Sequence, residues 1–143
     1  MQAQLIAEPA QQRQAVTQFS VLIIDDDEAM AEVLAARLTQ QGFATLTAHA
    51  GQEGLGLAIS RRPDVILLDL RLPDCDGFDL CAELDDSPET MGTPIIVLSG
   101  MARPDVIRRS RAAGCRYYVR KPYDPNALLL LIQQAIRESL EMD

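Results

Sequence analysis

The chain has 143 residues, of which 48% are hydrophobic, and this size and composition suit a single domain with its own core. Its formal net charge of −8 argues against direct binding of nucleic acid through the phosphate backbone. No apolar run approaches the roughly 18 residues of a membrane-spanning helix, and residues 1–19 lack the basic and apolar regions of a secretory signal. We therefore expect a cytoplasmic protein that does not bind membranes.

Residues 1–18 are rich in glutamine and alanine and form a predicted flexible extension, whereas residues 19–143 form the predicted domain. The domain begins with SVLIID at 20–25, a short continuous apolar run that is typical of a strand buried on both faces. The segment 28–42 follows as a predicted helix, which Gly42 ends. The apolar stripe of this helix consists of Met30, Val33, Leu34 and Leu38.

The same alternation of strands and helices continues to the end of the chain. Further strands are predicted at 43–48, 63–70, 94–100 and 115–120, and further helices at 51–62, 77–86, 104–114 and 124–143. The helix at 104–114 begins with proline and ends at glycine, the usual arrangement at helix ends. Five βα units with short connections predict an α/β fold: a single doubly wound, five-stranded parallel sheet with helices on both faces.

Polar side chains follow four of the predicted strands. They are Asp25 to Asp27 after the first strand, Asp69 at the end of the third, Ser99 at the end of the fourth and Lys121 after the fifth. Right-handed crossovers bring the carboxyl ends of parallel strands to one edge of the sheet. We expect Asp25, Asp26, Asp69, Ser99 and Lys121 to meet there and call this edge the acidic rim.

Carboxylates that converge on one edge repel one another unless a cation lies among them. Carboxylate oxygens are hard ligands, and a few protein ligands with retained water suit Mg²⁺ better than Ca²⁺ or Zn²⁺. Lys121, the only lysine in a chain with twelve arginines, adds a second positive charge. Asp69 is then the predicted nucleophile, because carboxylates form aspartyl-phosphates, and the Ser99 hydroxyl can donate to a phosphoryl oxygen.

Four motifs in this order resemble the response-regulator receiver domain of two-component signalling, over about residues 20–140. They are IIDDDE at 23–28, LLDLRLPDCDG at 67–77, VLSG at 97–100 and YVRKP at 118–122. The intervals of 30 residues from Asp69 to Ser99 and of 22 from Ser99 to Lys121 are also usual for that family. The resemblance implies a flavodoxin-like sheet with the strand order 2-1-3-4-5, as in the chemotaxis receiver.

The resemblance also implies the metal ligands. Asp26 matches the residue that binds Mg²⁺ directly, and Asp25 matches the one that acts largely through water. Asp69 matches both a metal ligand and the phosphoacceptor. Arg71 matches the position whose backbone carbonyl binds the metal.

Three further residues match positions that respond to the phosphoryl group. Ser99 matches the switch hydroxyl, Tyr118 the aromatic switch residue and Lys121 the lysine that pairs with the phosphate. The peptide bond between Lys121 and Pro122 matches one that is usually cis. Asp69, Ser99 and Lys121 are thus the predicted catalytic residues of self-catalysed phosphorylation and dephosphorylation, and we expect no other enzyme activity.

The expected partners also follow from the resemblance. A histidine kinase or a histidine phosphotransfer protein would donate the phosphoryl group from its phosphohistidine. A downstream partner protein or a separate output domain would recognise the altered surface near the fourth and fifth strands, and the family also allows a phosphorylation-dependent dimer. A stand-alone receiver, a phosphorelay shuttle and the receiver of a longer protein all fit this sequence.

Several residues have simpler interpretations. Asp27 and Glu28 are predicted to cap the first helix or lie in its first turn, outside the site. His49, the only histidine, is predicted to be a loop or surface residue. Four arginines lie in or just before the predicted helix at 104–114, either as solvated side chains near a helix end or as a contact for a partner. They are Arg103, Arg108, Arg109 and Arg111.

Two alternatives from other functional classes remain open. In a haloacid-dehalogenase-like phosphohydrolase, Asp25 would be the nucleophile and Asp27 the acid–base residue, but no later acidic motif follows Lys121. A pseudo-receiver that serves only as an interaction module is disfavoured because every site position is filled.

Three cysteines, Cys75, Cys81 and Cys115, have neither the even number of a disulfide framework nor the spacing of a zinc site. We expect buried or half-buried free thiols at all three positions.

Overall fold

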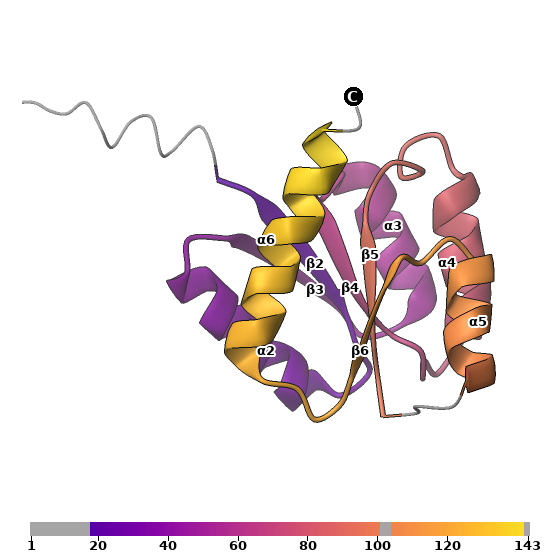
Figure 1. The fold of residues 1–143 in the computed structure, drawn as a ribbon, viewed down its shortest axis with the longest axis horizontal. Coiled ribbons are helices and arrows are strands. Elements are labelled where there is room, and N and C mark those ends of the chain that lie inside the picture. The colour runs from indigo at the N-terminus through magenta and orange to yellow at the C-terminus, as the bar shows by residue number, and fades with distance from the viewer. Residues whose placement is uncertain (1–17, 101–103, 142–143) are drawn as a thin grey trace, which may run out of the picture.

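A five-stranded parallel sheet forms the centre of the computed structural model, which describes residues 18–100 and 104–141 (Figure 1). The strands are β2 (Ser20–Ile24), β3 (Ala44–Ala48), β4 (Val65–Asp69), β5 (Ile95–Ser99) and β6 (Tyr117–Arg120). Their order β3-β2-β4-β5-β6 is the expected order 2-1-3-4-5, so the fold prediction is confirmed. The predicted flexible extension, residues 1–18, lies outside the described residues except for Gln18.

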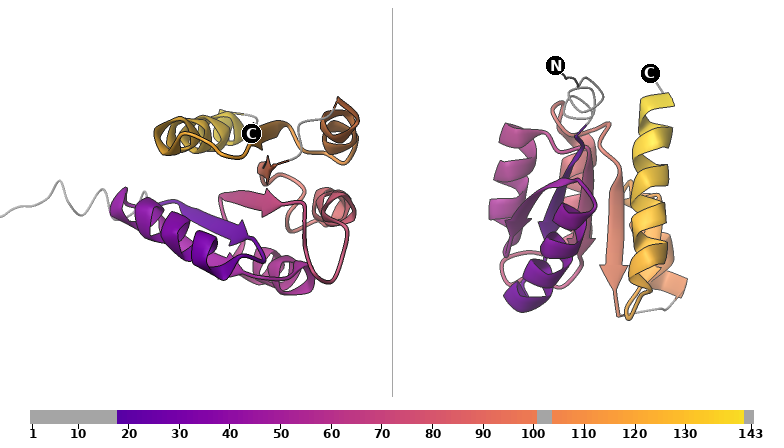
Figure 2. Two further views of the ribbon diagram at one scale, coloured as in Figure 1. Left: turned by 90° about the horizontal axis from the view of Figure 1, so that it is seen from below. Right: turned by 90° about the vertical axis from the view of Figure 1, so that its left-hand side faces the viewer.

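Helices cover both faces of the sheet. They are α2 (Glu28–Gln40), α3 (Gly51–Arg61), α4 (Gly77–Asp86), α5 (Pro104–Ala112) and α6 (Pro125–Glu141). Helices α2 and α6 pack on one face, and α3, α4 and α5 pack on the other (Figure 2). Among the described residues, no helix has the length and apolarity needed to span a membrane.

The continuous apolar sequence of β2 follows from its central place between these layers. Val21 and Ile23 face the core that contains α2 and α6, whereas Leu22 and Ile24 face the core that contains α3 and α4. All four side chains are at most 1% exposed. Burial of one such side chain stabilises the fold by about 1.5–3 kcal/mol relative to exposure, so both faces of the strand must be apolar.

Two glycines end helices in the same way. Gly42 follows α2 with φ 98°, and Gly114 follows α5 with φ 96°. After α2, the Gly42 N–H donates to Thr39 O and the Phe43 N–H donates to Leu38 O. After α5, the Gly114 N–H donates to Arg111 O and the Cys115 N–H donates to Ser110 O. These pairs define a Schellman motif, which needs a left-handed backbone that glycine adopts without strain.

The predicted apolar stripe of α2 is wrong at two positions. Leu34 and Leu38 are buried together with Ala31, but Met30 is 47% exposed and Val33 is 64% exposed. The small Ala31 side chain lies against the sheet, which turns the two larger side chains outward. Both line a surface groove near the acidic rim.

Candidate functional site

The carboxylates of the acidic rim meet at the carboxyl edge of the sheet, as the strand ends predicted. Asp69 ends β4, and Ser99 ends the neighbouring strand β5. One carboxylate oxygen from each of Asp25, Asp26 and Asp69 lies within 4.8 Å of the others. Asp26 is exposed, so solvent reaches the cluster from its side.

Asp25 is the most buried carboxylate of the rim, with 6% of its surface exposed. Its Oδ1 accepts the N–H of Asp27 at 2.9 Å, and its Oδ2 lies 3.4 Å from Lys121 Nζ. Burial raises the pKa of Asp25; the bond from Asp27 and the charge of Lys121 oppose this, and the nearby Asp69 carboxylate raises it again. The net pKa of Asp25 is raised, so the rim holds its negative charge at a cost that another cation would relieve.

Lys121 forms ion pairs with carboxylates at the ends of two strands, Asp25 after β2 and Asp69 in β4. Its Nζ lies 3.1 Å from Asp69 Oδ2 as well as 3.4 Å from Asp25 Oδ2. Its backbone N–H donates to Ser99 O at 2.8 Å, which fixes the start of the β6–α6 connection against the end of β5. Burial lowers the pKa of Lys121, but Asp69 and Asp25 outweigh burial and the pKa is raised overall. The expected cis peptide bond between Lys121 and Pro122 is present.

The loop after β4 orients the Asp69 carboxylate. Asp69 Oδ1 accepts the N–H of Arg71 at 2.9 Å. Arg71 forms an isolated antiparallel bridge with Asp76, whose side chain caps α4 by accepting the Phe78 N–H at 2.8 Å. The backbone carbonyl of Arg71 as a metal ligand stays a prediction.

The two predicted switch residues lie on neighbouring strands. Ser99 is 2% exposed, and Tyr118 pairs with Val97 across β5 and β6. Tyr118 packs against the core that contains α4 and α5, whereas Tyr117 packs against the opposite core. The Tyr118 hydroxyl is buried and has no hydrogen-bond partner in the described part of the chain.

Two residues near the rim have contacts that sequence reasoning missed. Asp74 accepts the N–H groups of Gly51 and Gln52 at 2.7 and 3.0 Å, so the β4–α4 loop caps α3. These two bonds lower the pKa of Asp74. His49 lies in the loop between β3 and α3, as expected, but it is half-buried and its Nδ1 lies 3.1 Å from the backbone O of Asp25. Neither contact has a local sequence signal, because each joins residues more than 20 positions apart.

Asp27 takes the helix-capping role expected of it. Its Oδ1 accepts the Met30 N–H at 3.1 Å, and Glu28 lies in the first turn of α2.

The donor set of the rim fits Mg²⁺. Three carboxylates supply hard oxygen ligands, and the exposed side of Asp26 leaves room for the water that Mg²⁺ retains. Burial raises the pKa of Asp25 despite the charge of Lys121, so a further cation at the rim would help to hold this carboxylate in its charged form. Asp25, Asp26 and Asp69 are therefore the side chains that would hold the ion.

Comparisons with known proteins agree with this geometry. The response regulator receiver domain family matches residues 21–133. The DNA-binding dual master transcriptional regulator RpaA of Synechocystis sp. is 31% identical over 83% of this chain and 49% of its own length. The cell cycle transcriptional regulator CtrA of Caulobacter vibrioides is 35% identical over 83% of this chain and 51% of its own length. The chain thus spans about half the length of these relatives.

Solved structures give the same result. A CheY-like receiver domain protein from Methanospirillum hungatei has a TM-score of 0.83 and 27% identity, covering 88% of this chain and 99% of that one. The chemotaxis response regulator CheY4 of Vibrio cholerae has a TM-score of 0.78 and 28% identity, covering 82% of this chain and 98% of that one. With the matching sequence motifs and strand order, these similarities show that the chain belongs to the response regulator receiver domain family.

Proposed function

We propose that this receiver accepts a phosphoryl group on Asp69 from the phosphohistidine of a histidine kinase or phosphotransfer protein. The observation that carries the proposal is the setting of Asp69: its Oδ2 lies 3.1 Å from the Lys121 ammonium, and a carboxylate oxygen of Asp69 lies within 4.8 Å of one from each of Asp25 and Asp26. A nucleophilic carboxylate thus has a cation and further hard oxygen ligands close to it. The family membership supports the same role.

In the proposed reaction, a carboxylate oxygen of Asp69 attacks the phosphorus atom and the N–P bond of the phosphohistidine breaks. The freed imidazole nitrogen keeps the bonding pair and takes up a proton from solvent. Lys121 pairs with the negative charge that gathers on the phosphoryl oxygens. The bond from the Arg71 N–H to Oδ1 holds the Asp69 carboxylate in one orientation. A Mg²⁺ ion at the rim would supply further positive charge for these oxygens.

The groove beside the rim is a proposed docking surface for the phosphoryl donor. It has a volume of about 430 Å³ and is lined mainly by apolar side chains of α2 and of the segment after β6. Met30 and Val33 contribute exposed apolar surface, and Lys121 links the groove to Asp69. A partner that packs on these side chains would place its histidine next to the rim.

The proposed response begins at Ser99 and Tyr118. The Ser99 hydroxyl would donate to a phosphoryl oxygen on Asp69 and draw the end of β5 inward. A buried hydroxyl without a partner costs roughly 1–3 kcal/mol, so the present packing of Tyr118 is one that a small energy change can shift. The phosphoryl group would bias two packings of the β5–α5–β6 surface that exist beforehand. A downstream partner, an output domain or a second copy of the receiver would recognise this surface.

The phosphohydrolase alternative gains no support from the contacts of Asp27. That reaction would need Asp27 as the acid–base residue, but its Oδ1 caps α2 through Met30. The pseudo-receiver alternative is likewise disfavoured, because Asp25, Asp26 and Asp69 form a compact cluster and Lys121 pairs with two of them.

Radiolabelled acetyl phosphate tests the proposal without a cognate kinase. The wild-type protein should take up label in the presence of Mg²⁺ and lose most of this uptake in a chelator. Asp69→Asn should not be labelled, whereas Asp79→Asn, which changes an exposed acid on α4, should behave as wild type. Equal labelling of wild type and Asp69→Asn would overturn the proposal.

A further inference from the structure

Two buried cysteines lie in direct contact on the face of the sheet that carries α4 and α5. Cys81 of α4 is fully buried, and Cys115, between α5 and β6, is 2% exposed. Their Sγ atoms are 2.6 Å apart although the residues are 34 positions apart in the sequence. A disulfide bond is about 2.05 Å long, so little movement separates these thiols from a covalent bond. Cys75 is only half-buried and takes no part in this contact.

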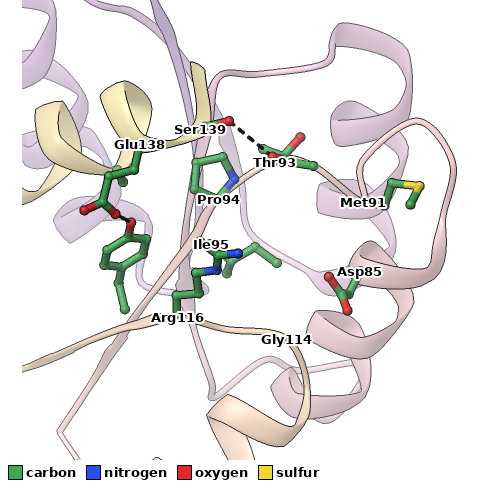
Figure 3. A pocket seen from close by; sticks show the side chains of 12 residues that line it. Asp85, Met91, Thr93, Pro94, Ile95, Gly114, Arg116, Glu138 and Ser139 are labelled. Carbon is green, nitrogen blue, oxygen red and sulfur yellow. Dashed lines mark hydrogen bonds between the residues drawn. The ribbon is translucent and has the colours of Figure 1, made fainter. Parts of the chain in front are cut away.

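The backbone around Cys115 is held firmly against α4. The Schellman motif after α5 fixes Cys115 through its N–H bond to Ser110 O. Gly114 lies so close to α4 that an added Cβ would be 2.6 Å from Asp85 Cγ, and Figure 3 shows the two residues facing each other. Asp85 is one helical turn from Cys81, so both residues lie on the α4 face that meets this segment. The contact between the thiols therefore belongs to a well-packed segment.

A surface groove leads to Cys115, one of the two cysteines. Cys115 lines a groove of about 390 Å³, together with Arg111 and Arg116. Cys81 is fully buried, and its contact with Cys115, together with this burial, raises the pKa of its thiol. Cys115 is accordingly the residue that an oxidant would reach first.

We propose that Cys81 and Cys115 form a reversible disulfide when the protein meets hydrogen peroxide. The Cys115 thiolate attacks the O–O bond, which gives a sulfenic acid and a hydroxide ion that takes up the proton lost by the thiol. The sulfur of Cys81 then attacks the sulfur of Cys115, and the hydroxyl group leaves with the Cys81 proton as water. In total, two thiols supply two electrons and hydrogen peroxide becomes two molecules of water. A thiol reductant reverses the bond by exchange.

The bond would tie α4 to the start of β6, three residues before Tyr118. It closes a loop of 34 residues and so stabilises the native state relative to the unfolded chain. Its consequence for signalling rests on the proposed function: the oxidised receiver would still accept phosphate on Asp69, but its α5–β6 surface would move less. The disulfide itself is independent of that function and should form equally in Asp69→Asn.

Intact mass spectrometry and non-reducing peptide mapping of the full chain after mild peroxide treatment test the proposal. Wild type should lose two hydrogen atoms in mass and yield one peptide pair linked through Cys81 and Cys115. The melting temperature should rise on the order of 10 °C and return after reduction. Cys75→Ser, the matched control, should behave as wild type, whereas Cys81→Ser and Cys115→Ser should form no intramolecular link.

Three results would overturn it. They are oxygen addition at Cys115 without a cross-link, a link that involves Cys75, and a mass that peroxide leaves unchanged. The peptide map of the wild-type protein decides the question even where a serine variant fails to fold.

Discussion

Lys121 Nζ lies 3.1 Å from Asp69 Oδ2, and this ion pair joins the ends of β4 and β6 across the intervening strand β5. The side chains of both residues are mostly buried, with 26% and 13% exposed, which limits screening by solvent. The same ammonium reaches Asp25 Oδ2 at 3.4 Å. One cation therefore faces two carboxylates, with the third, Asp26, on the open side.

Mg²⁺ should stabilise the protein. An ion that binds only the folded state adds roughly 1–3 kcal/mol to the free energy of unfolding when its concentration is 10 to 100 times the dissociation constant. Thermal melts with and without Mg²⁺ should therefore differ in the wild type, and Asp26→Ala should remove the difference. Glu28→Gln, which removes a neighbouring charge outside the rim, should keep it. A wild-type melting curve that Mg²⁺ does not change would contradict the proposed metal site.

Ser99→Ala should separate phosphorylation from the response to it. The variant keeps Asp69, Lys121 and the metal ligands, so it should still bind beryllofluoride, a mimic of the phosphoryl group. It lacks the hydroxyl that would draw β5 inward. Hydrogen exchange over residues 104–120 should change on binding in wild type and change much less in Ser99→Ala. Equal changes in both proteins would show that the coupling does not pass through Ser99.

The contact between Tyr117 and Glu138 should give the protein a specific alkaline transition. Burial and the hydrogen bond to Glu138 raise the pKa of Tyr117 to about 12, above its ordinary value of 10.0. A group whose pKa is raised by folding stabilises the fold fully below its unfolded pKa, and this stabilisation disappears as the pH rises through the folded pKa. Denaturant titrations between about pH 10 and 12 should thus show a loss of stability that is smaller in Tyr117→Phe, in which groups such as Lys121 still contribute. The same slope in Tyr117→Phe would contradict the assignment.

Substitution of two glycines by alanine should have opposite effects. Gly114 has φ 96° and no space for a Cβ beside Asp85, so Gly114→Ala should destabilise the fold by more than about 1 kcal/mol. Gly56 is exposed within α3, with nothing within 4 Å of an added Cβ, so Gly56→Ala should stabilise it by about 0.5–1 kcal/mol. Chemical denaturation of both variants measures the difference. A neutral Gly114→Ala would show that the contact between Gly114 and α4 is loose.

Most of the fold and the centre of the site could be predicted from the sequence, for a physical reason. Strands buried on both faces are marked by continuous apolar runs, and parallel strands bring their ends to one edge, so Asp25, Asp69 and Lys121 were expected together. The cap of α3 by Asp74 and the Cys81–Cys115 contact could not be predicted. Each depends on where side chains distant in the sequence meet after packing.

The error in α2 has a related cause. Helical periodicity locates an apolar face only to within part of a turn. Ala31 is small enough to pack closely against the sheet, whereas the larger Met30 and Val33 fit better at its border. Only the packed structure distinguishes a core position from the wall of the groove beside the rim.

Identification of the residue that carries the phosphoryl group tests the central claim most directly. The protein, labelled with acetyl phosphate in the presence of Mg²⁺, can be digested under conditions that preserve acyl phosphates and sequenced by tandem mass spectrometry. The account predicts a single modified position, Asp69. In Lys121→Met the same position should be labelled at a rate lower by a factor on the order of 100. Modification of Asp25, Asp26 or His49 in place of Asp69 would contradict it.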